Sequence, residues 1–201
     1  SMGTLCDIVN YLNRSDEDNA TMPQDGWQRE PVYPYPALHE LADGVMTYPQ
    51  ILQRIDQILD KFGKIRDTAS PELNNIRREL AKTEGSISRT LYSILRSAQS
   101  EGLIEKDVTP AMRDGRLVIP VVPTMKRKIK GIVHDESASG KTLFIEPTEV
   151  VEANNRVREL EAEERREIIR ILTEIAKIIR PHVPQILDSY KLLAQVDMIR
   201  A

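Results

Sequence analysis

The stretch GIVHDESASGKTLFIEP, residues 131–147, contains Gly140-Lys141-Thr142, the tripeptide that closes a phosphate-binding P-loop. A complete P-loop has a second glycine five residues before its Gly-Lys pair, so that successive backbone N–H groups surround the phosphates. Asp135 occupies that position in this chain, and its carboxylate would repel a phosphate. The residues after Lys141 predict a strand, whereas a P-loop opens a helix. We therefore do not expect a nucleotide site here.

The same stretch contains the residue types of a hydrolase, because His134 and Asp135 stand close to Ser137 and Ser139. Neighbouring residues of a strand point to opposite faces, so these side chains cannot form a proton relay. We expect a structural role instead. Asp135 and Ser137 are predicted to cap their own turn, and His134 to pack or hydrogen-bond nearby. Gly140 is predicted to supply a backbone conformation that other residues resist.

Composition narrows the class of protein. The 201 residues are 40% apolar, 4% aromatic and 29% charged, which is typical of long, exposed helices. The net charge of −3 means that any basic surface must be local. A single cysteine excludes an internal disulfide framework, and the three histidines lack the spacing of a zinc site. We find no signal peptide and no membrane-length apolar run, and so expect a soluble cytoplasmic protein without a membrane partner.

The first part of the chain predicts two short helices and a loop. Apolar residues at helical spacing indicate an amphipathic helix over residues 4–13 and another over residues 49–62, which Gly63 would end. Between them, the polar and Pro-rich segment 15–36 indicates a loop. The aromatic residues that we expect to pin this loop to a neighbour are Trp27, Tyr33 and Tyr35.

Two much longer helices are predicted further along the chain. Ser70 is a good N-cap and Pro71 suits a first turn, and apolar residues then recur at threes and fours until Gly102. The second long helix runs from Pro147 to Arg180, where two prolines stop it. The first apolar seam is narrow, and we expect the two seams to pair as an antiparallel coiled coil.

We expect structural roles for the polar residues within and just before the second long helix. Residues 156–167 include nine charged side chains among twelve, which predicts a solvated face. Asn154 and Asn155 fall on the seam side and are expected to fix the register of the helices. Glu146 precedes the helix and would lie near its positive end. The ion pairs expected to support the charged run include Glu161–Arg165 and Glu163–Arg166.

Between the long helices the pattern changes to the period of strands. Asp114-Gly115 is a strong hairpin signal, and Pro120 places its strand at an edge or at a bulge. The segments KRKIKGIVH and TLFIEP predict two more strands, which complete an antiparallel meander of about four strands. On the first of these strands, Lys128 and Lys130 would share one face.

Basic side chains gather on this predicted β-unit. A phosphate backbone would need such cations on exposed strands or turns, and contacts of this kind position DNA without reading its sequence. The same charges also occur as ordinary solubilising residues, which block aggregation at strand edges. From the residues alone, both interpretations stay open. The candidate nucleic-acid-binding residues are Arg116, Lys126, Arg127, Lys128, Lys130 and Lys141.

A family resemblance is carried by four segments: DTASPEL, MRDGRLVIPV, GIVHDESASGKTLFIEPTEVVEANNRVRELEAEE and LLAQVDMIRA. They resemble the MutS family, and within it the second bacterial branch, whose members carry a C-terminal Smr nuclease-like domain. The resemblance spans nearly the whole chain and implies the core, lever and clamp region of that family. In the family an ATPase domain follows the equivalent of LLAQVDMIRA, so the resemblance implies that this region carries no Walker motif, Smr domain or catalytic residue.

The resemblance also implies a parent protein that is a homodimeric ATPase, uses ATP and Mg²⁺, and closes around a nucleic acid. This branch is associated with suppressing recombination on branched DNA and with rescuing collided ribosomes. For this chain, the resemblance implies no cofactor, no enzymatic activity, and a clamp that binds branched or duplex DNA through its backbone. The alternative is a coiled-coil module that contacts the ribosome or a protein partner.

The predicted fold class is mainly α with a small antiparallel β-unit. Two long lever helices form the antiparallel coiled coil, a four-stranded clamp lies at its tip, and shorter core helices lie at its base. The predicted domains are core-type helices 1–69, an outgoing lever helix 70–107, a clamp 108–146, a returning lever helix 147–180 and a core helix 181–201, which leads to the ATPase domain of the parent.

Overall fold

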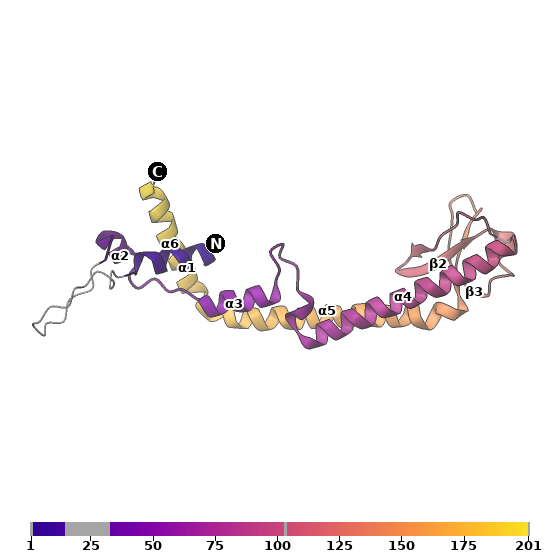
Figure 1. The fold of residues 1–201 in the computed structure, drawn as a ribbon, viewed down its shortest axis with the longest axis horizontal. Coiled ribbons are helices and arrows are strands. Elements are labelled where there is room, and N and C mark those ends of the chain that lie inside the picture. Colours follow the sequence, from indigo (N-terminus) through magenta and orange to yellow (C-terminus); the bar gives the residue numbers. More distant parts are fainter. Residues whose placement is uncertain (1, 15–32, 103, 201) are drawn as a thin grey trace, which may run out of the picture. The chain divides into compact units, whose positions relative to one another are not determined.

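The computed structural model describes residues 2–14, 33–102 and 104–200 of the chain. These residues form a mostly helical fold with one four-stranded antiparallel sheet, as the sequence predicts (Figure 1). Among the described residues, no helix is both long enough and apolar enough to cross a membrane. The chain divides into two compact units, one made of Ser1–Arg66 with Ile171–Ala201 and the other of Asp67–Arg170.

Helix α4 (Pro71–Ser100) begins as its sequence predicts. The Oγ of Ser70 accepts a hydrogen bond from the backbone N–H of Leu73 at 3.0 Å, and Pro71 occupies the first turn, where its missing N–H is tolerated. Gly102 follows the last turn with a φ of +70°, in the left-handed region that commonly ends helices. The helix therefore ends at Ser100, just before Gly102, as the sequence predicts.

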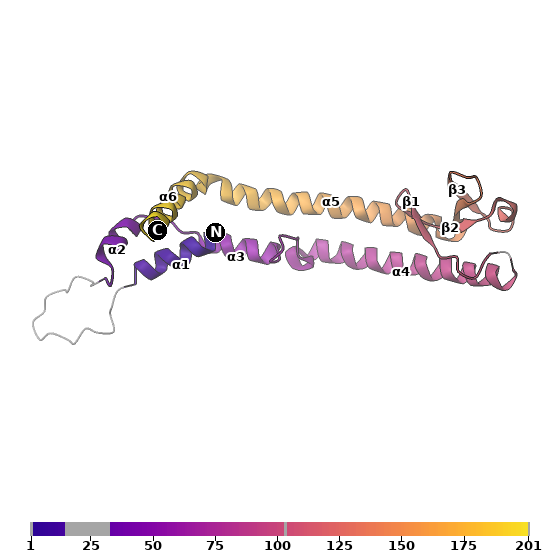
Figure 2. The same cartoon turned by 90° about the horizontal axis from the view of Figure 1, so that it is seen from above.

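Helix α5 (Val151–Ile179) follows a 3₁₀ turn (η4, Thr148–Val150), and its part up to Arg170 runs beside α4 (Figures 1 and 2). The side chain of Ser70, before α4, donates a hydrogen bond to Glu167 at 2.6 Å. Further along α4, Glu79 pairs at 2.9 Å with Arg156, which comes earlier in α5. The two helices are therefore antiparallel, while their packing as a coiled coil stays a prediction.

The charged run of α5 is not simply the solvated face that the sequence predicts. Val157 and Leu160 are buried within it, and Glu164 pairs at 2.7 Å with Arg77 of α4. Partial burial between two helices strengthens such a pair relative to an exposed one, because water screens it less. The pairs found in the structure therefore connect different residues from the predicted Glu161–Arg165 and Glu163–Arg166 pairs: Arg156, for example, contacts Glu79, Glu159 and Glu163.

The four strands are antiparallel and lie in the order β1-β2-β4-β3. β1 (Ala111–Arg113) and β2 (Arg116–Val121) form the predicted hairpin, and β3 (Gly131–Glu136) and β4 (Leu143–Pro147) form a second one. The predicted meander is wrong in its order, because β2 pairs with β4 and the connection after β2 carries β3 to the far edge.

The turn prediction for this sheet is confirmed, but β2 lies between β1 and β4 and is not the edge strand that Pro120 predicted. Asp114, with φ 48°, and Gly115, with φ 72°, have the left-handed conformations of a type I′ hairpin turn. The pairing of β1 with β2 extends only to Val118, so β4 is the one ladder partner of the strand at Pro120. Pro120 thus lies at a local edge, where its missing N–H is tolerated.

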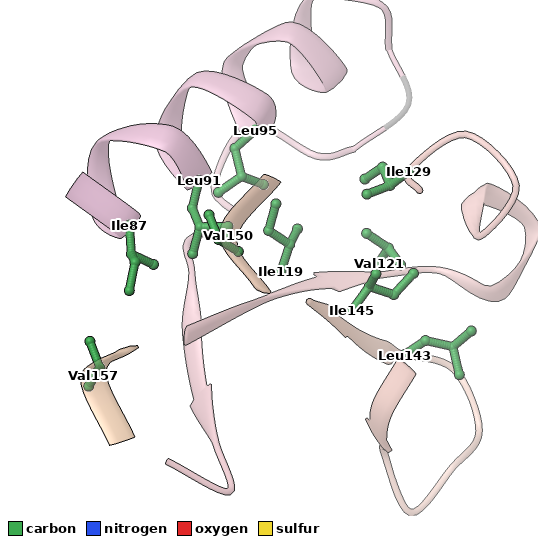
Figure 3. Packing of buried hydrophobic residues seen from close by; sticks show 10 residues of the cluster. All are labelled: Ile87, Leu91, Leu95, Ile119, Val121, Ile129, Leu143, Ile145, Val150 and Val157. Carbon is green, nitrogen blue, oxygen red and sulfur yellow. The ribbon is translucent and has the colours of Figure 1, made fainter. Parts of the chain in front are cut away.

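The sheet packs against the last turns of α4 (Figure 3). Leu91 and Leu95 of α4 meet Ile119 of β2 and Ile145 of β4, and each of these side chains is no more than 1% exposed. Because burying one such side chain contributes about 1.5–3 kcal/mol, the cluster fixes the sheet on the helix. Its members are Ile87, Leu91, Leu95, Ile119, Val121, Ile129, Leu143, Ile145, Val150 and Val157.

The other unit consists of shorter helices and the end of α5. α1 (Met2–Leu12) confirms the first predicted helix, whereas α2 (Pro36–Ala42) was not predicted. α6 (Val183–Arg200) follows α5 through a 3₁₀ turn at Arg180–His182, where the predicted prolines interrupt the helix. The predicted Pro-rich loop lies largely outside the described residues, and Trp27 entirely so. The core of this unit contains Leu5, Val9, Leu12, Ala42 and Leu192.

Helix α3 (Pro49–Ile58) is shorter than predicted. Leu59 leaves the helix and forms a bridge with Ile65, so the chain turns back before the predicted end at Phe62. Gly63, with φ +76°, lies in this turn and not at the end of the helix. Phe62 was predicted to lie on the apolar face of the helix, yet it is 76% exposed.

The buried face of α6 agrees only in part with the predicted one. The sequence predicts that Leu187, Tyr190, Leu193 and Val196 lie on the apolar side. Leu193 and Val196 pack against the core, but Leu187 and Tyr190 are 62% and 40% exposed. Ser189 and Leu192 are the buried residues, at 3% each, and Ser189 donates a hydrogen bond to the backbone carbonyl of Met46 at 3.0 Å.

Ser70 is the first residue that we would change. Replacing it with alanine removes the N-cap of α4 and the hydroxyl that donates to Glu167, whose pKa is lowered to about 2, chiefly by the hydrogen bond from Arg170. We expect Ser70→Ala to reduce the free energy of unfolding by about 1–2 kcal/mol, measured by urea denaturation at pH 7. Ser93→Ala, at an exposed position of the same helix, is the control. An unchanged denaturation midpoint for Ser70→Ala would contradict the capping role.

Glu167 also predicts a pH dependence. Because its pKa in the folded chain lies below the ordinary value of 4.5, its contribution to stability is complete above about pH 4.5 and is lost as the pH falls towards 2. In Glu167→Gln, the free energy of unfolding should therefore fall less steeply between about pH 4.5 and pH 2, the acid limb of the stability curve. Urea denaturation at a series of pH values would measure this. A limb as steep as that of the unmodified chain would contradict this assignment.

Candidate nucleic-acid interface

Four candidate cations lie together on the connection between β2 and β3. Pro123–Met125 form a short 3₁₀ helix after β2, and the residues up to Lys130 form a turn before β3 begins. The sequence prediction of a strand here is wrong, so Lys128 and Lys130 do not share a face by strand alternation. Pro123 explains the difference, because it lacks the N–H of a ladder and its fixed φ suits a turn. We call residues 126–130 the basic turn.

The basic turn is anchored at its end. Ile129 is 7% exposed and belongs to the core beneath the sheet, where Figure 3 shows it opposite Val121. The backbone carbonyl of Lys130 accepts a hydrogen bond from the N–H of Thr148 at 3.1 Å. A Cβ on Gly131 would lie 2.2 Å from the carbonyl oxygen of Glu146, so only glycine allows β3 to approach β4 this closely.

The four basic side chains of this turn are exposed to solvent. Within the described part of the chain, no carboxylate forms an ion pair with Lys126, Arg127, Lys128 or Lys130. Glu101 and Glu149 share a cavity of about 300 Å³ with the two last lysines and offset part of this charge. The turn therefore presents four cations against two neighbouring carboxylates, a positive surface in a chain with a net charge of −3.

Lys141 lies on the next turn, between β3 and β4. Gly140 has a φ of +68°, and the Oγ of Ser137 accepts a hydrogen bond from the N–H of Thr142 at 3.0 Å, so the predictions for these two residues are confirmed. Asp135, which was also predicted to cap this turn, pairs instead with Arg113 of β1 at 3.2 Å. The chain then enters β4 and not a helix, which excludes the geometry of a P-loop. Lys141 is exposed and lines a surface cavity of about 570 Å³ together with Val122, which precedes the basic turn by four residues.

Arg116, the sixth candidate, has partners inside the protein. Its guanidinium donates to Glu146 Oε1 and to Asn155 Oδ1, both at 2.7 Å. Glu146 is fully buried, and its carboxylate also accepts from the Nδ2 of Asn154 at 2.7 Å and contacts the Nε2 of His134 at 2.5 Å. The network therefore joins β2, β3, β4 and α5. We call it the Glu146 network.

The network keeps a charge inside the protein. Burial alone would raise the pKa of Glu146, but the hydrogen bonds from His134, Asn154 and Arg116 outweigh that effect and hold its pKa below the ordinary value. His134 stands at a bulge, because the register of β3 against β4 shifts between Val133 and Asp135. With both oxygens of Glu146 occupied, the network is suited to structural support and not to catalysis.

Sequence reasoning misplaced two members of this network. Glu146 was predicted to lie near the start of a helix, but it belongs to β4 and is buried. Asn154 was predicted to fix the register of two helices, but its amide bonds to Glu146 and, at 3.3 Å, to the backbone carbonyl of Leu117. It therefore ties α5 to the sheet. A carboxylate in the otherwise apolar strand TLFIEP is the signal that could have revealed the network.

Comparison with known proteins shows that most of the chain is similar to part of a group of longer proteins. It is 40% identical over 167 residues, or 83% of its length, to the endonuclease MutS2 of a Geobacillus species, and equally to that of Pelotomaculum thermopropionicum. It is 38% identical over 195 residues, or 96% of its length, to the endonuclease MutS2 of Ruminiclostridium cellulolyticum. The chain spans about a fifth of the length of these relatives, from 21% to 23%. No family model matches it.

The Glu146 network predicts a large effect of one substitution. Glu146→Gln leaves the half-buried Arg116 without its carboxylate, and breaking a buried pair in this way costs about 3–5 kcal/mol. The pKa of Glu146 is lower in the folded chain than in the unfolded chain. The loss of stability should therefore be complete at pH 7 and shrink as the pH falls below the pKa of Glu146 in the unfolded chain.

Urea denaturation at pH 7 and at pH 4 measures this effect. Glu149→Gln, which changes an exposed carboxylate close by, is the control and should unfold like the unmodified chain. Equal stability of Glu146→Gln and the unmodified chain at pH 7 would contradict the supporting role of the network.

Proposed function

Because the chain belongs to the MutS family, in its second bacterial branch, we propose that its β-unit is a clamp that binds duplex or branched DNA through the phosphate backbone. The clamp is carried by two lever segments, residues 70–107 and 147–180. The chain binds and positions DNA and does not itself catalyse a reaction. The observation that carries this proposal is the basic turn, which places four exposed cations on one anchored segment.

The chemistry of the turn fits a phosphate backbone. Cations without partners in the described protein are available to replace the counterions of DNA, and the release of those counterions drives binding without regard to base sequence. Ile129 and Gly131 fix the backbone of the turn, so little conformational freedom is lost when a ligand binds. Lys141, on the adjacent turn, extends the same surface.

Arg116 does not belong to the proposed contact surface. Its side chain is 15% exposed, and Glu146 and Asn155 already accept from its guanidinium. Turning it towards DNA would leave the buried Glu146 carboxylate without its cation, at a cost of several kcal/mol. We therefore propose five contact residues, namely Lys126, Arg127, Lys128, Lys130 and Lys141.

The name of the relatives assigns a nuclease activity to those longer proteins, and the chain spans about a fifth of their length. Among the described residues, no three potential ligands gather into a metal site. We propose that cleavage, ATP, Mg²⁺ and the contacts of a homodimer belong to other parts of the parent protein, in the cytoplasm.

A second candidate function rests on the exposed apolar side chains of the end of α5 and α6. Ile178, Val183, Leu187 and Tyr190 are each at least 40% exposed. Such side chains favour contact with a protein, and the resemblance includes a ribosome-associated role, so a module that docks on the ribosome or on a protein partner is the alternative. Apolar contact responds little to salt, whereas phosphate contact responds steeply, and this difference separates the two functions.

Charge reversal of the basic turn tests the clamp. The variant Lys126→Glu, Arg127→Glu, Lys128→Glu, Lys130→Glu should lose binding to a duplex and to a four-way junction in fluorescence anisotropy. If all four residues contact phosphates, the plot of log binding constant against log salt concentration becomes less steep by roughly 0.9 for each lost contact.

The matched control reverses four exposed cations on α4 and α5, namely Arg78, Lys82, Arg165 and Arg166, and so makes the same change in net charge. This control should keep most of the affinity. Equal losses in the two variants would show a general charge effect and contradict the clamp. Binding that does not change with salt would favour the docking module.

A further inference from the structure

The turn between α3 and α4 presents an aromatic side chain on a rigid support. Leu59 and Ile65 form a β-bridge, the N–H of Asp60 donates to the carbonyl of Lys64 at 2.8 Å, and the N–H of Arg66 donates to the carbonyl of Ile58 at 2.8 Å. In Figure 1 the turn stands out from the end of α3. We call residues 59–65 the Phe62 turn.

Asp60 stabilises the turn from within. Its Oδ1 accepts hydrogen bonds from the backbone N–H groups of Phe62, at 2.8 Å, and Lys64, at 2.9 Å. The bond from Lys64 is the main reason that the pKa of Asp60 lies below its ordinary value. Gly63, with φ +76°, provides the left-handed residue at the tip. The carboxylate also attracts Lys64 and Arg66, so it offsets part of the charges that the turn presents outward.

Those outward charges are positive. Lys61 and Lys64 flank Phe62 in the sequence and are both exposed, and the Nζ of Lys61 lies 5.0 Å from the centroid of the Phe62 ring. Even so, Phe62 remains 76% exposed, one of the most exposed large apolar side chains of the described chain. The other exposed aromatic side chains of the described residues, those of Tyr11, Tyr35, Tyr92 and Tyr190, are only 40–59% exposed.

We propose that the Phe62 turn is a second DNA contact, in which Phe62 stacks on an unpaired base and Lys61 and Lys64 contact the phosphates beside it. Stacking of bases on aromatic rings, with cations along the backbone, is how proteins bind single strands without sequence preference. The inference rests on the proposed function and deepens it. Phosphate contacts of the basic turn do not distinguish unpaired from fully paired DNA, whereas a residue that stacks on an unpaired base does.

The charge of the turn favours a nucleic acid over a protein pocket as the ligand. A protein pocket that accepts Phe62 would also have to desolvate or pair the lysines on either side of it. A nucleic acid supplies both partners in one repeating unit, a base for the ring and a phosphate for each ammonium group. Because the backbone of the turn is held by its hydrogen bonds, few rotatable bonds lose their freedom when a base stacks on the ring.

The test compares two DNAs of equal length, one fully paired and one with an unpaired stretch that contains 2-aminopurine. Phe62→Ala should bind the second DNA about five- to tenfold more weakly and bind the first unchanged, and it should no longer quench 2-aminopurine fluorescence. Phe62→Leu keeps an apolar side chain but not the ring, so it should behave like the alanine variant. Phe62→Trp should retain both affinity and quenching.

The other outcomes would overturn the inference. If Phe62→Leu binds like the unmodified chain, apolar packing and not stacking is responsible. If Phe62→Ala weakens both DNAs equally, or neither, the turn has no preference for unpaired bases. A loss of the preference with a changed thermal unfolding midpoint would indicate a structural role, so circular dichroism accompanies each variant. Met112→Ala, at another exposed apolar position, is the control.

The outcomes also separate this inference from the clamp. If the inference alone fails, duplex binding persists and still depends on the basic turn. If the clamp alone fails, charge reversal of the basic turn has no effect, while the preference for unpaired DNA still depends on Phe62. Absence of binding to either DNA at low salt would overturn both.

Discussion

The burial of the Glu146 carboxylate is the constraint on which the β-unit depends. A charge removed from water is tolerated only with partners, and here each partner comes from a different element: Arg116 from β2, His134 from β3 and Asn154 from α5. The carboxylate therefore specifies how three strands and a helix meet, which apolar packing alone would leave less well defined. The proposed DNA surface is a consequence of that arrangement.

The basic turn shows how this constraint reaches the surface. Gly131 lets β3 approach β4 at the carbonyl of Glu146, and Ile129 fills the core between the sheet and α4. The cations lie between and around these two fixed points, so their backbone is held although their side chains are in solvent. A surface of this kind can contact phosphates along any DNA without adapting its own fold, which suits a clamp better than a sequence reader.

Sequence reasoning succeeded where local chemistry decides the outcome. Ser70, Gly102 and Asp114-Gly115 ended or turned their elements as predicted, because caps and tight turns depend on neighbouring residues. Sequence reasoning failed where the structure depends on contacts between residues that are far apart in the sequence. The strand order, the burial of Glu146 and the partner of Asn154 depend on contacts that no spacing encodes. The basic turn was taken for a strand because its alternating pattern outweighed the signal of Pro123. The six candidate cations were correctly grouped in one unit, yet only the structure shows that Arg116 is engaged inside it.

Lysine acetylation footprinting with mass spectrometry, in the presence and absence of a matched DNA duplex, would show which lysines DNA covers. We expect DNA to protect Lys126, Lys128 and Lys130 strongly and Lys141 to a lesser degree. Lys82, Lys177 and Lys191, which are exposed on helices, should remain as reactive as in the free protein. Equal protection of all exposed lysines, or protection of the helical lysines alone, would contradict the assignment of the basic turn as the DNA-binding surface.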